Sequence, residues 1–276
     1  MMGKARLQEQ LLQENLRKSG YISNKQAEEM LGVSVSTIRR LFINLEASGT
    51  AVRKHGGIQY LPTPEGSADY LFEQHEALHE SEKLAIAACA ADQVESGDTL
   101  FIDWGTTTQR FCMMLAKRLE NDIHNITVFT NSQVNIHLLC ERCAVLCIGG
   151  QYRSNRRDFT GYLAEESLKN LQFTKCFVGC DGYSSTLGFT QFDFPSARIN
   201  EIAFANSRKR YILMDSSKYG APATVGFAKG SMVDVLITEV NPPEEMLPPL
   251  QRQVKEIMVC PAKKQPEPTI PLTCGM

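Results

Sequence analysis

The residues best suited to bind a small ligand follow short apolar segments in the larger, C-terminal part of the chain. Asp103 and three consecutive threonines come soon after the apolar residues 99–102, and Lys218 follows an Asp-Ser-Ser turn. Hydroxyl and backbone N–H groups at the start of a helix bind anions such as phosphate, and Lys218 adds a positive charge. Carboxylates such as Asp103 and Asp181 accept hydrogen bonds from sugar hydroxyls. The candidate ligand-binding residues are Asp103, Trp104, Gly105, Thr106, Thr107, Thr108, Thr130, Asn131, Ser132, Gly149, Gly150, Asp181 and Lys218.

A simpler explanation for some of these residues is local turn chemistry. Loops between strands and helices use Gly, Asp, Asn, Ser and Thr as turn and cap residues in any protein. The three threonines at 106–108 and the lysine at 218 exceed what capping requires. The pattern therefore favours a small-ligand site, and Trp104 can stack on a sugar ring or narrow the pocket.

Short apolar strands alternate with helices along this part of the chain. We expect strands at 99–102, 126–129, 144–148, 175–178, 211–214 and 233–238, and helices at 82–94, 107–119, 133–140, 165–171 and 199–207. This alternation is typical of an α/β fold with a mostly parallel sheet flanked by helices. Ligands of open α/β sheets bind at the carboxyl ends of the strands, so the candidate residues are expected to converge there.

The first 60 residues have a different pattern. Leucines at helical spacing predict a helix over residues 4–18, and two further helices are expected at 25–31 and from Ser34 to about Ala47. Ser23 or Asn24 can cap the second helix, and Gly32 can adopt a positive φ in the turn that follows. Two short helices joined by a tight turn, with a basic outer face on the second, are typical of a helix-turn-helix.

Residues 49–60 predict a strand, a turn and a strand with basic residues near the turn. Such a wing can contact the phosphate backbone or the minor groove of DNA. The alternative is a small three-helix bundle used for protein contacts. The candidate DNA-binding residues are Ser34, Ser36, Thr37, Arg39, Arg40, Arg53, Lys54 and His55.

Length and charge agree with two modules. The chain has 276 residues and a net charge of −2, yet residues 1–60 carry nine basic and five acidic side chains and the remainder carries 20 basic and 26 acidic ones. A small basic domain joined to a larger acidic one is typical of a nucleic-acid reader with a second module. The N-terminus is too polar for a signal peptide and no apolar run could span a membrane, so we expect a cytoplasmic protein.

The nine cysteines are interpreted as mostly small buried hydrophobic residues in a reducing compartment. Cys140 and Cys143, with His137 before them and Cys147 after, are the alternative, a metal site. A structural zinc site needs a second ligand pair at a distance, and the sequence offers none. No metal or cofactor is therefore predicted.

The N-terminal motifs resemble the DNA-binding domain of DeoR-family bacterial transcription regulators. The resemblance rests on Val33-Ser34-Val35-Ser36-Thr37-Ile38-Arg39-Arg40, on Leu45–Gly49 and on the wing Arg53–Gly57. It extends to the motifs Ile102–Thr108, Thr130–Ser132, Gly149-Gly150 and Asp215–Gly220, which look like the effector-sensing domain of that family. Leu41 departs from the acidic residue usual after the Arg pair, and Asn200 or Glu201 stands where the family often has a lysine.

The resemblance implies a winged helix-turn-helix at 1–60 and an effector-sensing and oligomerisation domain at 79–260. Composition predicts the linker at 61–78 and a disordered, proline-rich tail at 261–276. The larger domain is then similar in fold to sugar-phosphate isomerases. The implied function is a repressor of carbohydrate genes that binds a double-stranded operator as a homodimer or homotetramer and responds to a phosphorylated sugar. The alternatives are a sugar-phosphate isomerase or deaminase, with Asp103 or Asp181 as general base and Lys218 stabilising an enediolate, and a scaffold without ligand.

Overall fold

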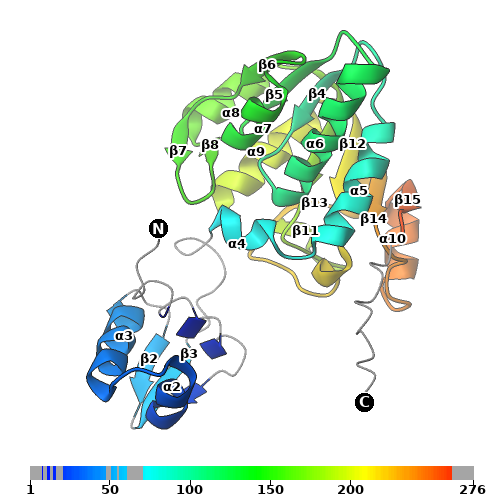
Figure 1. The fold of residues 1–276 in the computed structure, drawn as a ribbon. Helices are drawn as coiled ribbons and strands as arrows, with labels where there is room; N and C mark the ends of the chain where they lie inside the picture. The colour runs from blue at the N-terminus through cyan, green and yellow to red at the C-terminus, as the bar shows by residue number, and fades with distance from the viewer. Residues whose placement is uncertain are drawn as a thin grey trace, which may run out of the picture. The chain divides into compact units, whose positions relative to one another are not determined.

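The computed structural model describes residue 8 and residues 11–12, 15–16, 21–47, 51–54, 56–60 and 71–262. The chain divides into two compact units, Met1–Glu65 and Gly66–Met276, whose elements are shown in Figure 1. This boundary falls inside the predicted linker. Most of that linker, at 61–70, and the predicted tail from residue 263 lie outside the described residues.

The smaller unit contains helices and a three-stranded antiparallel sheet in the order β1-β3-β2. Its elements are β1 (Tyr21–Ser23), α2 (Asn24–Leu31), α3 (Val35–Ala47), β2 (Ala51–Lys54) and β3 (Gly57–Tyr60). The predicted helix at 4–18 is partly described, and its described residues Gln8, Leu11, Leu12, Asn15 and Leu16 are helical. The strand β1, which pairs with the wing, is an addition that the sequence did not predict.

Local signals explain the turn between α2 and α3. The Ser23 hydroxyl accepts a hydrogen bond from the Gln26 N–H at 3.2 Å, and the Ser23 N–H donates to the Gln26 side chain at 2.9 Å. This capping box begins α2. Gly32 ends the helix with a φ of 61°, a conformation that glycine adopts at little cost. Ala27 is fully buried in the core shared with α3, and its small side chain lets the two helices approach closely.

The larger unit is a seven-stranded parallel sheet in the order β15-β14-β12-β9-β4-β5-β6, with helices on both faces (Figure 1). Its strands are β4 (Thr99–Ile102), β5 (Thr127–Thr130), β6 (Ala144–Cys147), β9 (Phe173–Gly179), β12 (Ser207–Leu213), β14 (Val235–Thr238) and β15 (Glu256–Val259). Its helices are α4 (Phe72–Glu76), α5 (Glu80–Asp92), α6 (Thr106–Asn121), α7 (Gln133–Leu139), α8 (Tyr162–Lys169), α9 (Phe194–Ala205), α10 (Leu247–Gln253) and the short 3₁₀ helices η1 (Ser216–Lys218) and η2 (Gly230–Met232). The predicted α/β class is confirmed.

The direction of chain progression through the sheet reverses beside β4. From β4 the chain continues to β5 and β6 on one side, and then returns to β9 on the other side of β4. Such a reversal opens a crevice at the carboxyl ends of the two central strands, where ligands bind in open α/β sheets. Asp103 directly follows β4 and Gly179 ends β9, so both flank this point.

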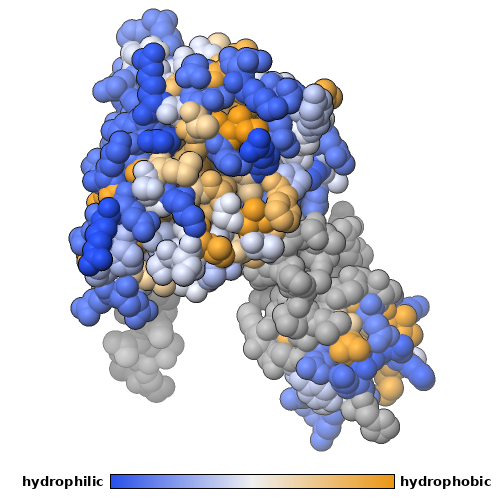
Figure 2. Space-filling view, turned by 180° about the vertical axis from the view of Figure 1, so that it is seen from behind, coloured by the Kyte–Doolittle hydropathy of each residue, from blue (hydrophilic) through white to orange (hydrophobic). Residues whose placement is uncertain are grey.

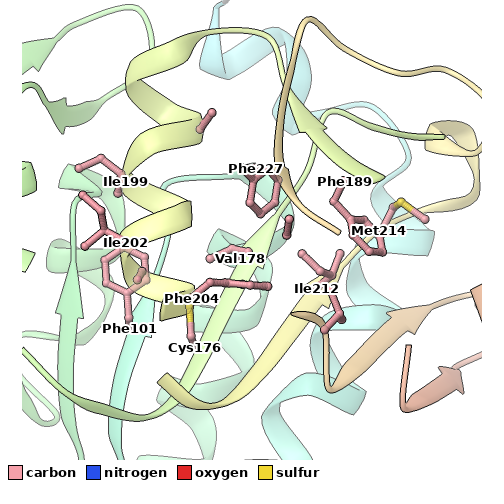
Figure 3. Packing of buried hydrophobic residues seen from close by; sticks show 14 of the residues in the cluster. Phe101, Cys176, Val178, Phe189, Ile199, Ile202, Phe204, Ile212, Met214 and Phe227 are labelled. Carbon is pink, nitrogen blue, oxygen red and sulfur yellow. The ribbon is translucent and has the colours of Figure 1, made fainter. Parts of the chain in front are cut away.

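Alternate residues of the central strands pack into two different core clusters. Phe101 belongs to the cluster that contains residues of α8 and α9, whereas Leu100 and Ile102 belong to the cluster that contains residues of α5 and α6. Figure 3 shows the first cluster, with Phe101 beside Ile202. Burying one such large apolar side chain contributes about 1.5–3 kcal/mol, so the two clusters hold the sheet and its strand ends in place.

Two small antiparallel sheets were not predicted. A hairpin is formed by β7 (Gln151–Arg153) and β8 (Asp158–Thr160), and a second sheet by β10 (Gly182–Ser184), β11 (Gly188–Gln191) and β13 (Val225–Ala228). These strands have three or four residues, too few for a clear alternating pattern. The start of β10 also packs closely against the backbone of Ala221, because a Cβ atom on Gly182 would lie 1.8 Å from the Ala221 carbonyl oxygen.

The interpretation of the cysteines as buried thiols is wrong for several of them. Cys89 in α5 and Cys260 after β15 form a disulfide across a sequence separation of 171 residues, and no local pattern reveals such a pairing. Cys140 and Cys147 are exposed. Within the described ranges, no three His, Cys, Asp or Glu side chains are grouped to hold a metal ion. No helix in those ranges is both long and apolar enough to cross a bilayer.

Candidate functional site

The exposed face of α3 carries the predicted DNA contacts. One face of α3 is buried in the core and carries Ile38, Leu41, Phe42 and Leu45. Arg39 and Arg40 are exposed on the other side of the helix. Leu41 therefore packs in the core at the position where the resemblance suggested an acidic side chain. Burial of one face leaves both guanidinium groups available to phosphates or base edges.

Hydroxyl groups at the start of α3 form a local cluster. The Ser34 hydroxyl shares hydrogen bonds with the Ser36 hydroxyl at 2.9 Å and the Thr37 hydroxyl at 3.0 Å. Ser34 and Ser36 are exposed and Thr37 is half-buried. The N-terminal end of α3 thus presents polar groups of the kind that contact DNA in helix-turn-helix proteins.

One of the predicted wing residues has a second role. Arg53 in β2 bonds both through its side chain, at 2.5 Å, and through its backbone N–H, at 3.1 Å, to the Glu46 carboxylate in α3. These bonds lower the pKa of Glu46. Arg53 therefore links the wing to α3, whereas the neighbouring Lys54 is exposed. The predicted contact His55 lies outside the described residues.

In the larger unit, Asp103 organises the strand ends. Its Oδ1 accepts hydrogen bonds from the Thr108 hydroxyl at 2.6 Å and the Gly105 N–H at 3.1 Å, and its Oδ2 accepts from the Gly179 N–H at 2.9 Å and Asn200 Nδ2 at 3.4 Å. Burial raises the pKa of Asp103, and these four bonds oppose the shift. Asp103 and Thr108 thus connect β4, α6, β9 and α9 and are engaged by the protein itself.

Thr106 and Thr107 are placed differently from Thr108. They occupy the first turn of the 16-residue helix α6, which Gly105 precedes as N-cap. The first N–H groups of a helix have no helical acceptor. Among the described residues, the two hydroxyls have no hydrogen-bond partner either, so this turn presents unused donors at the carboxyl end of β4.

A buried charged cluster lies beside Trp104. The guanidinium of Arg156 lies over the Trp104 ring at 5.0 Å from its centroid, and Arg156 Nη1 lies 3.0 Å from Asp193 Oδ2. Arg153 contacts Asp193 at 2.8 Å and also pairs with the buried Asp158. Burial raises the pKa of Asp193, but Arg156 and Arg153 outweigh it and lower the pKa below its usual value. The indole therefore stacks on a protein cation in this structure.

Two further predicted residues, Asp181 and Lys218, lie in one electrostatic neighbourhood with Arg156. Burial raises the pKa of Asp181 to about 6, although Lys218 and Arg156 lower it in part. The Asp181 carboxylate accepts one hydrogen bond from the Phe192 N–H at 2.9 Å. Lys218 ends η1, is half-buried, and makes no side-chain hydrogen bond or ion pair within the described part of the chain. It is therefore a cation available to a ligand.

Lys83 is a cation that the sequence did not reveal. Its Nζ donates to the His75 carbonyl at 2.5 Å, and burial lowers its pKa to about 8, with Lys218 and Arg110 adding repulsion. A lysine within the alanine-rich helix α5 gives no sequence signal of this position. Arg156 likewise stands in a polar turn that normally predicts an exposed loop.

The remaining predicted residues support neighbouring elements. Ser132 caps α7 by accepting from the Asn135 N–H at 3.2 Å, and the Thr130 hydroxyl accepts from the Ser132 N–H at 3.1 Å. Asn131 Nδ2 donates to the Phe159 carbonyl in β8 at 3.1 Å. Gly149 and Gly150 are exposed just before β7, and a Cβ on Gly150 would lie 2.5 Å from the Thr160 carbonyl oxygen. Gly150 thus allows the close approach of the backbone in the hairpin β7–β8.

The same hairpin contacts the segment that leads into the larger unit. The Phe72 N–H donates to the Asn155 carbonyl at 3.0 Å, and the Arg157 guanidinium lies 5.6 Å from the centre of the fully buried Phe72 ring. Arg156 of this turn contacts Trp104 and Asp193, as described above. One short turn therefore links α4 to the strand-end cluster.

A winged helix-turn-helix with an exposed basic helix, followed by an α/β unit with polar strand ends, defines a DNA-binding regulator with a ligand-sensing domain. Comparison with known families gives the same result. Residues 8–63 match the "DeoR-like helix-turn-helix domain" and residues 78–240 match the "DeoR C terminal sensor domain". The chain belongs to the DeoR family of transcription regulators.

Relatives in this family match almost the whole chain. The glycerol-3-phosphate regulon repressor of Escherichia coli K12 is 28% identical over 90% of this chain and 96% of its own length. The lactose phosphotransferase system repressor of Lactococcus lactis is 31% identical over 86% of this chain and 92% of its own. Among solved structures, ribose 5-phosphate isomerase A of Methanocaldococcus jannaschii is 18% identical over 51% of this chain and 54% of its own, with a TM-score of 0.39. That structural likeness is too low to support any statement about function.

Proposed function

We propose that the chain represses genes of carbohydrate metabolism and that a phosphorylated sugar, bound at the strand ends of the larger unit, lowers its affinity for the operator. The observation that carries the proposal is the α6 N-terminus, where Thr106 and Thr107 present hydroxyls without a protein partner among the described residues. An anion is stabilised by such donors and by the positive end of the helix dipole.

Cations of the larger unit support an anionic ligand. Lys218 has a free ammonium group within the described residues, and Lys83 and Arg156 lie in the same electrostatic neighbourhood. The names of the two relatives refer to glycerol-3-phosphate and to a lactose phosphotransferase system. We extend this general chemistry, and neither particular compound, to the present chain.

The DNA-binding part of the proposal assigns base and phosphate contacts to Arg39 and Arg40 of α3. A bidentate pair between arginine and guanine discriminates between bases by about 1–3 kcal/mol, whereas a phosphate contact adds salt-dependent affinity. Lys54 is assigned to the DNA backbone. Arg53 is assigned to it too, although its bonds to Glu46 make it less available. No cofactor is required, and the protein acts in the compartment that holds its operator, the cytoplasm.

In the proposed function, the residues at the strand ends have no catalytic role. Asp103, a candidate general base, accepts four hydrogen bonds from the protein, which favours a structural role over proton abstraction. We therefore propose a regulator without enzymatic activity.

We also propose that the chain works as a homodimer or homotetramer, because paired half-sites require a symmetric reader. Hydrophobic side chains gather on the face of the larger unit shown in Figure 2. Tyr162, Leu163 and Phe194, at the starts of α8 and α9, are 72%, 67% and 72% exposed. Exposed apolar side chains of this size are frequent at protein interfaces.

The test separates the two binding functions with two variants. Arg39→Ala combined with Arg40→Ala should abolish binding to duplexes selected from a random library by the native protein, and leave the response of Trp104 fluorescence to sugar phosphates unchanged. Lys218→Ala should bind these duplexes normally and lose the response. Lys117→Ala, on the exposed side of α6, is the matched control. A normal response of the Lys218 variant would contradict the assignment of the site.

A further inference from the structure

Four buried side-chain amides in the larger unit have an oxygen without a hydrogen-bond partner. Within the described residues, these are Asn131, Asn135, Gln191 and Asn200. All four side chains are at most 2% exposed. Leaving a buried carbonyl oxygen unpaired is unfavourable, and native proteins satisfy most such groups with protein, water or ligand. These oxygens therefore identify places where a donor is missing.

The orientation of each amide is fixed by its NH₂ group. Asn131 donates to the Phe159 carbonyl, Asn135 to the Asp103 carbonyl, Gln191 to the Gly179 carbonyl and Asn200 to the Asp103 carboxylate. Carbonyl oxygens only accept hydrogen bonds, as do ionised carboxylates. Exchanging the nitrogen and oxygen of any of these amides would place two acceptors together. The free position is thus an acceptor in all four cases.

Two of these amides are held at the carboxyl ends of the adjacent strands β9 and β4. Gln191 Nε2 donates to the Gly179 carbonyl at 3.2 Å, while the Gly179 N–H and Asn200 Nδ2 both donate to Asp103 Oδ2. Asp181 follows Gly179 by two residues and adds a half-buried carboxylate. The strand end at the reversal point of the sheet is therefore rich in acceptors, whereas the start of α6 presents donors.

This division has a chemical consequence for the ligand. A fully ionised phosphate has no proton to donate, so it does not satisfy an amide oxygen. Hydroxyl and ammonium groups do donate. We propose, on the basis of the function proposed above, that Gln191 and Asn200 form a specificity subsite that accepts hydrogen bonds from hydroxyl or ammonium groups on the part of the effector remote from its phosphate.

The first experiment measures which donors the native, full-length protein recognises. Trp104, the single tryptophan of the chain, reports binding of glucose 6-phosphate, glucosamine 6-phosphate, fructose 6-phosphate, ribose 5-phosphate, glycerol 3-phosphate and inorganic phosphate through its fluorescence. The best probe is then compared with its analogues that each lack one hydroxyl or amine. Loss of the recognised group should weaken binding at least tenfold, since an unpaired buried acceptor remains.

The second experiment removes the acceptors. Gln191→Leu and Asn200→Leu should each weaken the best probe about tenfold or more and reduce its advantage over the deoxy analogue to about onefold. Their affinity for inorganic phosphate should stay unchanged. Asn206→Leu is the matched control, because Asn206 directly follows α9 as its C-cap and its amide also donates to a carbonyl, that of Leu168.

Each outcome decides one of the two proposals. If the Leu variants keep both affinity and selectivity, the amides bind only water and the subsite is wrong. If the variants do not fold, the analogue series decides, and a change below twofold for every removed group overturns the subsite. If no sugar phosphate changes Trp104 fluorescence or the melting temperature of the native protein, the proposed effector function itself fails, and the subsite fails with it.

Discussion

Replacing Asp193 by asparagine removes one negative charge from the cluster beside Trp104 and changes the side-chain volume little. Asp193 Oδ2 lies 3.0 Å from Arg156 Nη1, and the Arg156 side chain is 1% exposed. Removing one partner of a buried ion pair typically costs about 3–5 kcal/mol, because the remaining charge is left uncompensated. Arg153 retains Asp158 as a partner, so we expect a loss near the lower limit, about 3 kcal/mol.

The pH dependence of this loss has a definite sign. The pKa of Asp193 is lowered in the folded protein, so its ionised form stabilises the fold above the ordinary carboxyl pKa. That contribution disappears as pH falls through 3.8 toward the lowered value. The difference between the native protein and Asp193→Asn should therefore be full at pH 7 and shrink in acid.

Urea unfolding followed by Trp104 fluorescence measures this loss, because the single tryptophan lies inside the cluster. A double variant, Asp193→Asn with Arg156→Gln, removes the positive charge of Arg156 as well. The loss in free energy of unfolding of the double variant should be about 1–3 kcal/mol smaller than the sum of the losses of the two single variants. A single-variant loss below about 1 kcal/mol, or strict additivity in the double variant, would refute the interpretation of the cluster as a coupled ion-pair network.

Two other variants test features of the larger unit. Burial raises the pKa of Asp234, but hydrogen bonds from Arg210 and Lys255 outweigh this effect and lower the pKa to about 2. Asp234→Asn should therefore destabilise the protein by about 2 kcal/mol at pH 7, as measured by urea unfolding. The loss should become progressively smaller as pH falls from 4 to 2. Phe72→Ala should cost about 3–5 kcal/mol in thermal or urea unfolding.

Much of the fold was predictable because six of the seven strands of the parallel sheet contain a short apolar run; β15 was not predicted. Ile102-Asp103 marks the end of such a run, and Gly32 marks the turn of the helix-turn-helix through its positive φ. These signals are local, so they depend on a few neighbouring residues. The α/β class and the winged helix-turn-helix follow from them.

The missed features depend on contacts between distant segments. Arg156 stands in a polar turn, and only packing against Trp104 and Asp193 buries it. Asp103 was predicted as a ligand contact, whereas the structure surrounds its carboxylate with four protein donors. Asn200 has a role that requires knowledge of both Asp103 and Gly179. Asn200 and Asp103 are 97 positions apart in the sequence, and no short spacing encodes their pairing.

The disulfide between Cys89 and Cys260 has a topological consequence. All seven strands of the parallel sheet lie between these two residues, so this part of the chain is a covalent ring, and the DNA-binding unit lies outside it. A single backbone cut within the ring, for example at residues 153–158, leaves both fragments joined until a reductant is added. A cut at residues 61–70 instead separates the DNA-binding unit at once. Non-reducing and reducing gels of partly digested protein therefore distinguish the two classes of cleavage site.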